Sequence, residues 1–130
     1  MARVVVAALL LGLGLGLVSG CSGKVEDDDD DEVDPVLACR TYASTWCNKA
    51  FGCYVQVGRL DESLRQGNVD TCVSIVVDKL PCSAASSLGD DYDKCISQIK
   101  GMACSKWDVP QTQFGTVRPP ASCDNALNYE

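Results

Sequence analysis

No histidine occurs among the 130 residues of this chain. Ser-His-Asp and Cys-His nucleophile arrangements, His-ligated zinc sites and general bases that titrate near neutral pH all need an imidazole. The sequence therefore excludes these kinds of site for the chain on its own, and we expect neither a metal site nor a cofactor. Glycoside hydrolysis by a pair of carboxylates needs no histidine. A carboxylate hydrolase thus stays open as the least favoured hypothesis.

A cluster of basic residues is lacking too. The formal net charge of the chain is −7, yet the part from Pro35 to the C-terminus holds ten acidic and nine basic residues and is nearly neutral. Without a basic patch or stripe, the chain has no electrostatic footprint for binding a nucleic acid. The excess negative charge lies in residues 26–34, of which eight are acidic.

The sequence also has no apolar run long enough to span a bilayer. Residues 4–18 are uninterrupted apolar residues that follow a single positive charge, Arg3, and they include three glycines. A helix that spans a bilayer needs about 20 such residues. The shorter run after a basic residue predicts a secretory signal peptide over residues 1–20.

Cys21 follows the predicted signal peptide directly, in the sequence Val18-Ser-Gly-Cys21. This sequence resembles the bacterial lipobox, which has an aliphatic residue and two small residues before a cysteine. The resemblance implies that Cys21 receives a diacylglycerol, and that cleavage makes it the acylated first residue of the mature protein. The chain has nine cysteines, so setting Cys21 aside leaves an even number that can pair completely. We expect the acyl chains to hold the protein at a membrane, since two or three chains anchor stably where one does not.

The acidic residues that follow Cys21 favour a disordered, solvated segment. Runs of like charge repel one another and seldom fold, and residues 27–31 lack the glycine turn and spaced ligands of a calcium loop. We interpret residues 21–34 as the lipidated cysteine with an acidic tether. Fully extended, the 13 residues from Ser22 to Asp34 reach about 45 Å at 3.3–3.6 Å per residue.

The other eight cysteines predict a framework of four disulfides. No Cys-x-x-Cys occurs among them, which disfavours a thioredoxin-type redox centre and a zinc ribbon. An exported compartment lets disulfides persist, and a domain of fewer than 100 residues needs such cross-links. The number of connectivities is 105, and the spacing does not choose among them. The cysteines are Cys39, Cys47, Cys53, Cys72, Cys82, Cys95, Cys104 and Cys123.

Helical periodicity dominates the segment that begins at Pro35. Apolar residues recur at three- and four-residue intervals up to Val57, with Asp34 as an N-cap and Pro35 in the first turn. Gly58 supplies a stop, and residues 61–66 suggest a short helical turn.

Two further helices are predicted. Residues 69–80 carry apolar residues on one face, with Asn68 or Asp70 as the cap, although the β-branched run Val73–Val77 makes a strand the competing prediction. After a small-residue loop at 83–89, acidic residues precede a helix through Tyr92 and Met102, with Gly101 as its C-cap.

These patterns predict a mainly α fold, a small disulfide-stapled bundle of about three helices over residues 35–130. Beyond Cys104, prolines and a glycine predict an irregular C-terminal tail, which Cys123 ties back to the bundle. An up-down-up arrangement would put the end of the first helix beside the start of the second, so Cys53–Cys72 is the favoured disulfide. Aromatic side chains on the first helix and in the tail are expected to fill the core rather than to form a binding surface.

Four stretches carry a wider resemblance. They are C-R-T-Y-A-S-T-W-C-N-K-A-F-G-C, D-T-C-V-S-I-V-V-D-K-L-P-C, Y-D-K-C-I and P-A-S-C-D, between residues 39 and 124. Together they resemble the small cysteine-rich lipoproteins of myxobacteria and related delta-proteobacteria. The resemblance implies a lipid-anchored protein of a bacterial cell envelope, and it transfers no active site.

Three functions follow as hypotheses. The first is a non-catalytic binding or structural module, outside the cytoplasm and on the outer rather than the inner membrane, with an envelope protein or a glycan as partner. The second is a carrier of a small apolar ligand inside the helical core. The third is the carboxylate hydrolase, which needs two carboxyl groups that face each other across a cleft.

Overall fold

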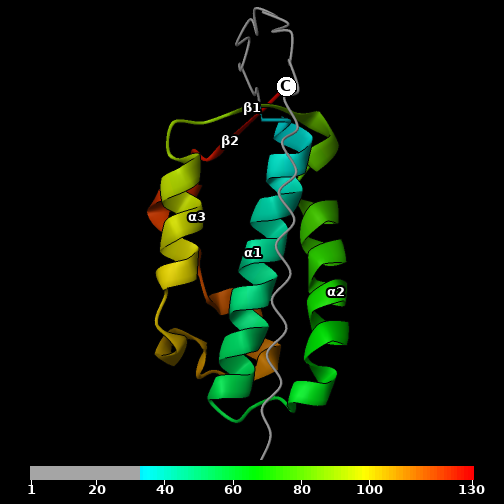
Figure 1. Ribbon diagram of the computed structural model, residues 1–130, viewed down its shortest axis with the longest axis vertical. Coiled ribbons are helices and arrows are strands. Elements are labelled where there is room, and N and C mark those ends of the chain that lie inside the picture. Colours follow the sequence, from blue (N-terminus) through cyan, green and yellow to red (C-terminus); the bar gives the residue numbers. More distant parts are fainter. Residues whose placement is uncertain (1–32) are drawn as a thin grey trace, which may run out of the picture. The chain divides into compact units, whose positions relative to one another are not determined.

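Three helices form the bundle in the computed structural model, which describes residues 33–130. Helix α1 spans Pro35–Gln56, α2 spans Glu62–Lys79 and α3 spans Tyr92–Gly101. Helix α1 lies between the other two, and the chain runs along the three in alternating directions (Figure 1). The predicted mainly helical, disulfide-stapled fold is confirmed.

Helix α1 begins where its sequence predicts. The Asp34 carboxylate accepts a hydrogen bond from the backbone N–H of Val36 at 2.9 Å, and Pro35 occupies the first turn, where its missing N–H costs nothing. Because α1 is covered by α2, α3 and the tail, it buries residues around most of its circumference. These are Ala38, Cys39, Ala43, Trp46, Cys47, Ala50, Phe51, Cys53 and Tyr54.

Helix α2 is longer than predicted. It is one continuous helix from Glu62 rather than a short turn followed by a helix from residue 69, and its N-cap is Asp61, which accepts from the N–H of Ser63 at 2.8 Å. Gly67 is helical, at a cost of about 1 kcal/mol relative to alanine that packing against α1 offsets. The competing prediction of a strand at Val73–Val77 is wrong.

The predicted loop after α2 contains a strand. A short 3₁₀ helix, η1 (Cys82–Ala84), leads into β1 (Ala85–Leu88), which pairs antiparallel with β2 (Leu127–Tyr129) at the end of the tail. Gly89 allows this approach, since a Cβ there would lie 1.8 Å from the carbonyl oxygen of Asn125.

Helix α3 and the tail close the fold. Gly101 is the last residue of α3 and Met102 its C-cap, so the predicted cap is displaced by one residue. The tail holds three short 3₁₀ helices with irregular connections. They are η2 (Cys104–Trp107), η3 (Gln111–Thr116) and η4 (Ala121–Cys123).

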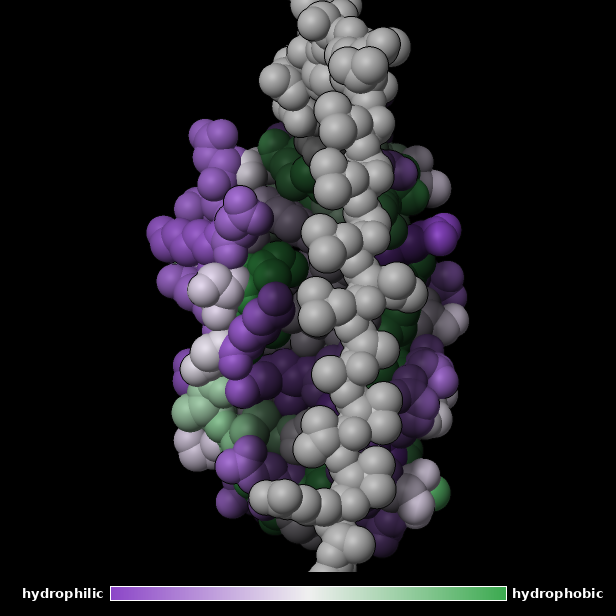
Figure 2. All heavy atoms as spheres, in the orientation of Figure 1, coloured by the Kyte–Doolittle hydropathy of each residue, from purple (hydrophilic) through white to green (hydrophobic). Residues whose placement is uncertain are grey.

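Aromatic rings join α1 to the tail in one cluster. The rings of Trp46 and Trp107 are 4.7 Å apart between centroids, and Phe114 of η3 lies 5.9 Å from Trp107. Tyr54 and Trp107 have no solvent exposure. The prediction that aromatic residues fill the core is confirmed for these side chains. On the face shown in Figure 2, the hydrophobic residues that remain visible form several patches separated by hydrophilic ones.

Candidate functional site

All eight cysteines of the described residues are paired, as predicted. The disulfides are Cys39–Cys82, Cys47–Cys72, Cys53–Cys104 and Cys95–Cys123. Three of them attach a different segment to α1, and the fourth attaches η4 to α3. The favoured pair Cys53–Cys72 is wrong.

The early start of α2 explains this error. In two antiparallel helices joined by a short loop, residues at equal distances from the loop lie side by side. Cys47 comes nine residues before the end of α1, and Cys72 comes ten residues after the start of α2. Cys53 lies only three residues from the end of α1, and it meets Cys104 of η2 instead.

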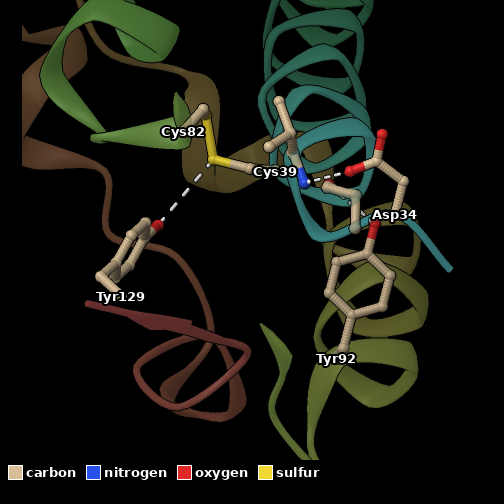
Figure 3. Close-up of a disulfide and its surroundings, with 7 residues drawn as sticks. Asp34, Cys39, Cys82, Tyr92 and Tyr129 are labelled. Carbon is tan, nitrogen blue, oxygen red and sulfur yellow. Dashed lines mark hydrogen bonds between the residues drawn. A yellow bond between two sulfur atoms is a disulfide. The ribbon is translucent and has the colours of Figure 1, made fainter. Parts of the chain in front are cut away.

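The start of α1 is held by contacts from both the sheet and α3. The hydroxyl of Tyr129, on β2, lies 3.9 Å from Cys39 Sγ, and the hydroxyl of Tyr92 donates a hydrogen bond to the carbonyl of Ala38 at 2.9 Å (Figure 3). The predicted acidic tether therefore joins the domain at a fixed point, the capped end of α1 at Asp34.

Two acidic residues of the domain line the same cleft. Asp90 and Asp91 are neighbours in the chain, and both line a polar cleft of about 330 Å³ together with Asn125 and Asn128. The hydrogen bonds from Ser63 lower the pKa of the Asp61 carboxyl, which is opposite to what a general acid requires. Within residues 33–130 no three His, Cys, Asp or Glu side chains are placed to hold a metal ion.

An apolar cleft of about 270 Å³ lies between α2 and η3, and we call it the α2–η3 cleft. Helix α2 contributes most of its lining, α1 contributes one residue and η3 two. The lining residues are Phe51, Asn68, Thr71, Cys72, Ile75, Val76, Lys79, Phe114 and Gly115.

The α2 side of this cleft is a single helical stripe. Its six residues fall at positions i, i+3, i+4, i+7, i+8 and i+11, the spacing of one helix face. The stripe begins at Asn68 and ends at Lys79, and these eleven residue steps span about 16 Å at 1.5 Å per residue. Apolar Cys72, Ile75 and Val76 lie between the two polar ends.

Aromatic rings line the opposite side of the cleft. Phe51 and Phe114 are stacked, with centroids 5.8 Å apart and an interplanar angle of 13°. Phe114 also contacts Trp46 and Trp107, the two tryptophans of the chain, at centroid distances of 6.5 and 5.9 Å. A displacement of Phe114 would therefore change the surroundings of both indoles.

This cleft was not predicted from the sequence. The α2 face that contains Cys72 and Val76 was expected to lie in the core, while Ile75, one turn along, is 49% exposed in the cleft. Phe114 and Gly115 come from a tail segment with no periodicity, so no sequence pattern indicated that they face α2. Predicted sites at residues 1–32, the lipidated Cys21 among them, lie outside the described residues.

No protein-family model, curated protein or solved structure matches the chain. Within the described part of the chain, no helix is both long enough and apolar enough to cross a bilayer.

Proposed function

We propose that the protein is a lipid-anchored, non-catalytic binding module of a bacterial cell envelope, which takes up a small apolar ligand in the α2–η3 cleft. The cleft carries the proposal, since small-molecule sites are concave and mostly apolar with a few polar groups. Its volume of about 270 Å³ lies just below the range of drug-sized sites, which favours a small ligand.

The location of the ligand differs from the earlier hypothesis of a carrier. That hypothesis put the ligand among the three helices, where Trp107, Tyr54 and Ile99 have no exposed surface. The α2–η3 cleft is instead open to solvent at the outer edge of α2. A ligand can reach it without separating the disulfide-linked helices.

The sequence supports the envelope location. Cys21 follows a lipobox-like sequence, and the four disulfides favour an oxidising compartment. The resemblance to myxobacterial and delta-proteobacterial lipoproteins supports the same location. The absence of histidine supports a non-catalytic role.

A neutral fluorescent probe tests the proposal. The chain from residue 21, with Cys21→Ser and an exchanged signal peptide, would be titrated with N-phenylnaphthylamine. We expect saturable binding to one site, lost in Ile75→Asp because a carboxylate would stand among apolar lining atoms.

Leu64→Asp is the matched control. Leu64 is also an exposed apolar residue of α2, at 58% exposure, and it does not line the cleft. Leu64→Asp should therefore bind the probe like the parent protein. Equal binding by both variants, or no saturable binding by the parent, would overturn the proposal.

A further inference from the structure

We infer that the ligand of the α2–η3 cleft is a fatty acid, with its alkyl chain along α2 and its carboxylate at Lys79. This inference rests on the proposed function and adds the chemistry of the ligand. It follows from which polar groups of the cleft are already bonded within the protein, and from the distance between the two ends of the lining stripe.

The polar side chains at the Asn68 end carry no charge. The Asn68 side-chain amide donates to the carbonyl of Leu64 at 2.8 Å, and the Thr71 hydroxyl donates to the carbonyl of Gly67 at 2.9 Å. Neither side chain can form an ion pair with a carboxylate. This end suits the methyl end of an alkyl chain.

The Lys79 ammonium, at the other end of the stripe, is not bonded to another described side chain. It is the one charged residue of the lining, and it takes part in none of the hydrogen bonds or ion pairs between the described side chains. Its neighbours one turn back on α2 are Ile75 and Val76, which cannot pair with an ammonium. The Lys79 ammonium is therefore available to a ligand anion.

The helix end makes this preference depend on Lys79 alone. The last turn of α2 carries the partial negative charge of its carbonyl groups, which by itself repels an anion. Lys79 is the one positive charge of the cleft lining, and the acidic Asp78 precedes it in the same turn. Removal of the Lys79 charge should therefore abolish the selectivity for carboxylates rather than merely weaken it.

The dimensions suit one alkyl chain. The stripe from Asn68 to Lys79 spans about 16 Å, and between its ends only Thr71, Cys72, Ile75 and Val76 of α2 line the cleft. A volume of about 270 Å³ is too small for a lipid with two acyl chains beside the Phe51 and Phe114 rings. A free fatty acid meets both limits.

Displacement of bound N-phenylnaphthylamine by ligands that share one alkyl chain tests the inference. Dodecanoate and dodecyltrimethylammonium, below their micelle concentrations, would be compared with dodecanol below its solubility limit. Tryptophan fluorescence is the second readout. For the parent protein we expect dodecanoate to bind about fivefold more tightly than dodecanol, the ratio expected of one exposed charge pair.

Three variants separate the charge of Lys79 from its structural role. Lys79→Met should bind dodecanoate no better than dodecanol, and Lys79→Glu should prefer dodecyltrimethylammonium. Lys100→Met is the matched control, since Lys100 stands in the last turn of α3 and does not line the cleft. It should keep the parent preference.

The outcomes distinguish the two proposals. If the probe binds but the parent protein shows no preference for dodecanoate, or if Lys79→Met keeps that preference, the fatty-acid inference is wrong and the apolar cleft stands. If neither the probe nor any alkyl ligand binds, the proposed function fails as well.

Discussion

Two buried tyrosines of the core differ in what their hydroxyl groups contact. Tyr92 donates to the carbonyl of Ala38 at 2.9 Å. The hydroxyl of Tyr54 has no hydrogen-bond partner among the described residues, although the side chain is fully buried. A buried hydroxyl without a partner costs about 1–3 kcal/mol, whereas a satisfied one contributes about 1 kcal/mol.

The two Tyr→Phe variants should therefore change stability in opposite directions. Tyr92→Phe removes the side-chain hydrogen bond to the Ala38 carbonyl and should lower the free energy of unfolding by about 1 kcal/mol. Tyr54→Phe removes the unbonded hydroxyl and should raise it by about 1 kcal/mol. Urea unfolding with the disulfides intact measures both values. Destabilisation of similar size in both variants would contradict this prediction.

The same residues predict a loss of stability at alkaline pH. Burial raises the pKa of Tyr54, against a smaller opposing effect of Arg59, and burial also raises the pKa of Tyr92. The folded state then keeps protons that the unfolded chain has lost. Stability should not change through these groups at lower pH, and should fall above about pH 10, where tyrosine in the unfolded chain titrates.

Unfolding midpoints between about pH 8 and about pH 11 test this dependence. Burial also raises the pKa of Tyr42 and Tyr129, so the fall should be smaller but still present in Tyr54→Phe, which lacks one of four such groups. A parent midpoint that stays constant across this range would show that burial does not hold these protons.

Single residues were predictable from the sequence where the cause is local. Asp34 as the cap of α1 depends only on the next two residues. The pairing of Cys47 with Cys72 depends on where α2 begins. Gly67 and Asn68 are residue types that often interrupt a helix, but packing against α1 keeps them helical. The sequence therefore predicted which cysteines pair internally, and not which partner each one has.

Helix α2 has two roles in this fold. Val69 and Cys72 are buried against the core, while Ile75 lies exposed in the cleft. The disulfide to Cys47 fixes α2 on α1 from its middle, directly below the cleft. The position of the cleft wall should thus depend on this one bridge.

Removal of this disulfide should affect both stability and binding. The variant Cys47→Ala/Cys72→Ala opens a loop of 25 residues and should lose about 3 kcal/mol of unfolding free energy. The melting temperature should fall by roughly 12–24 °C. Binding of N-phenylnaphthylamine should weaken, because α2 gains freedom and because Cys72 itself lines the cleft.

A second double variant separates the two effects. Cys95→Ala/Cys123→Ala opens a loop of 28 residues between α3 and η4, neither of which lines the cleft. Calorimetry should show a similar loss of stability, and titration should show unchanged probe binding. Equal loss of binding in both variants would mean that the cleft depends on global stability and not on the attachment of α2.

Elements with strong periodicity were predicted, and those formed by long-range pairing were not. The three helices follow from their apolar spacing, with errors only at their ends. Strand β1 has the sequence Ala-Ser-Ser-Leu, which lacks apolar alternation, and it exists because β2 pairs with it from the far end of the chain. The α2–η3 cleft also depends on contacts between distant parts of the chain, because Phe114 reaches α2 only through the folding of the tail.

The domain and the segment that precedes it differ in charge. Residues 26–34 hold eight acidic side chains, whereas the domain from Pro35 is almost neutral and encloses all four disulfides. An anionic segment is repelled by anionic lipid, and in the proposed function it would hold the cleft away from the membrane surface. Attachment would then depend on the acyl chains of Cys21 and not on the domain.

Cys21→Ser should therefore release the protein from membranes or block its maturation. Acyl chains contribute about 0.8 kcal/mol per buried methylene, and serine has no thiol to receive a diacylglycerol. Ser22→Ala is the control, since it changes the neighbouring residue and keeps the lipobox-like sequence. Fractionation, together with mass spectrometry of the N-terminal peptide, should find acylation and membrane association in the parent and Ser22→Ala only.

Because the nine cysteines would then be one lipid attachment site and four disulfides, thiol labelling of the denatured, unreduced parent should find no free thiol. Unchanged fractionation of Cys21→Ser would disprove the anchor, and a single labelled thiol in the parent would identify Cys21 as unmodified.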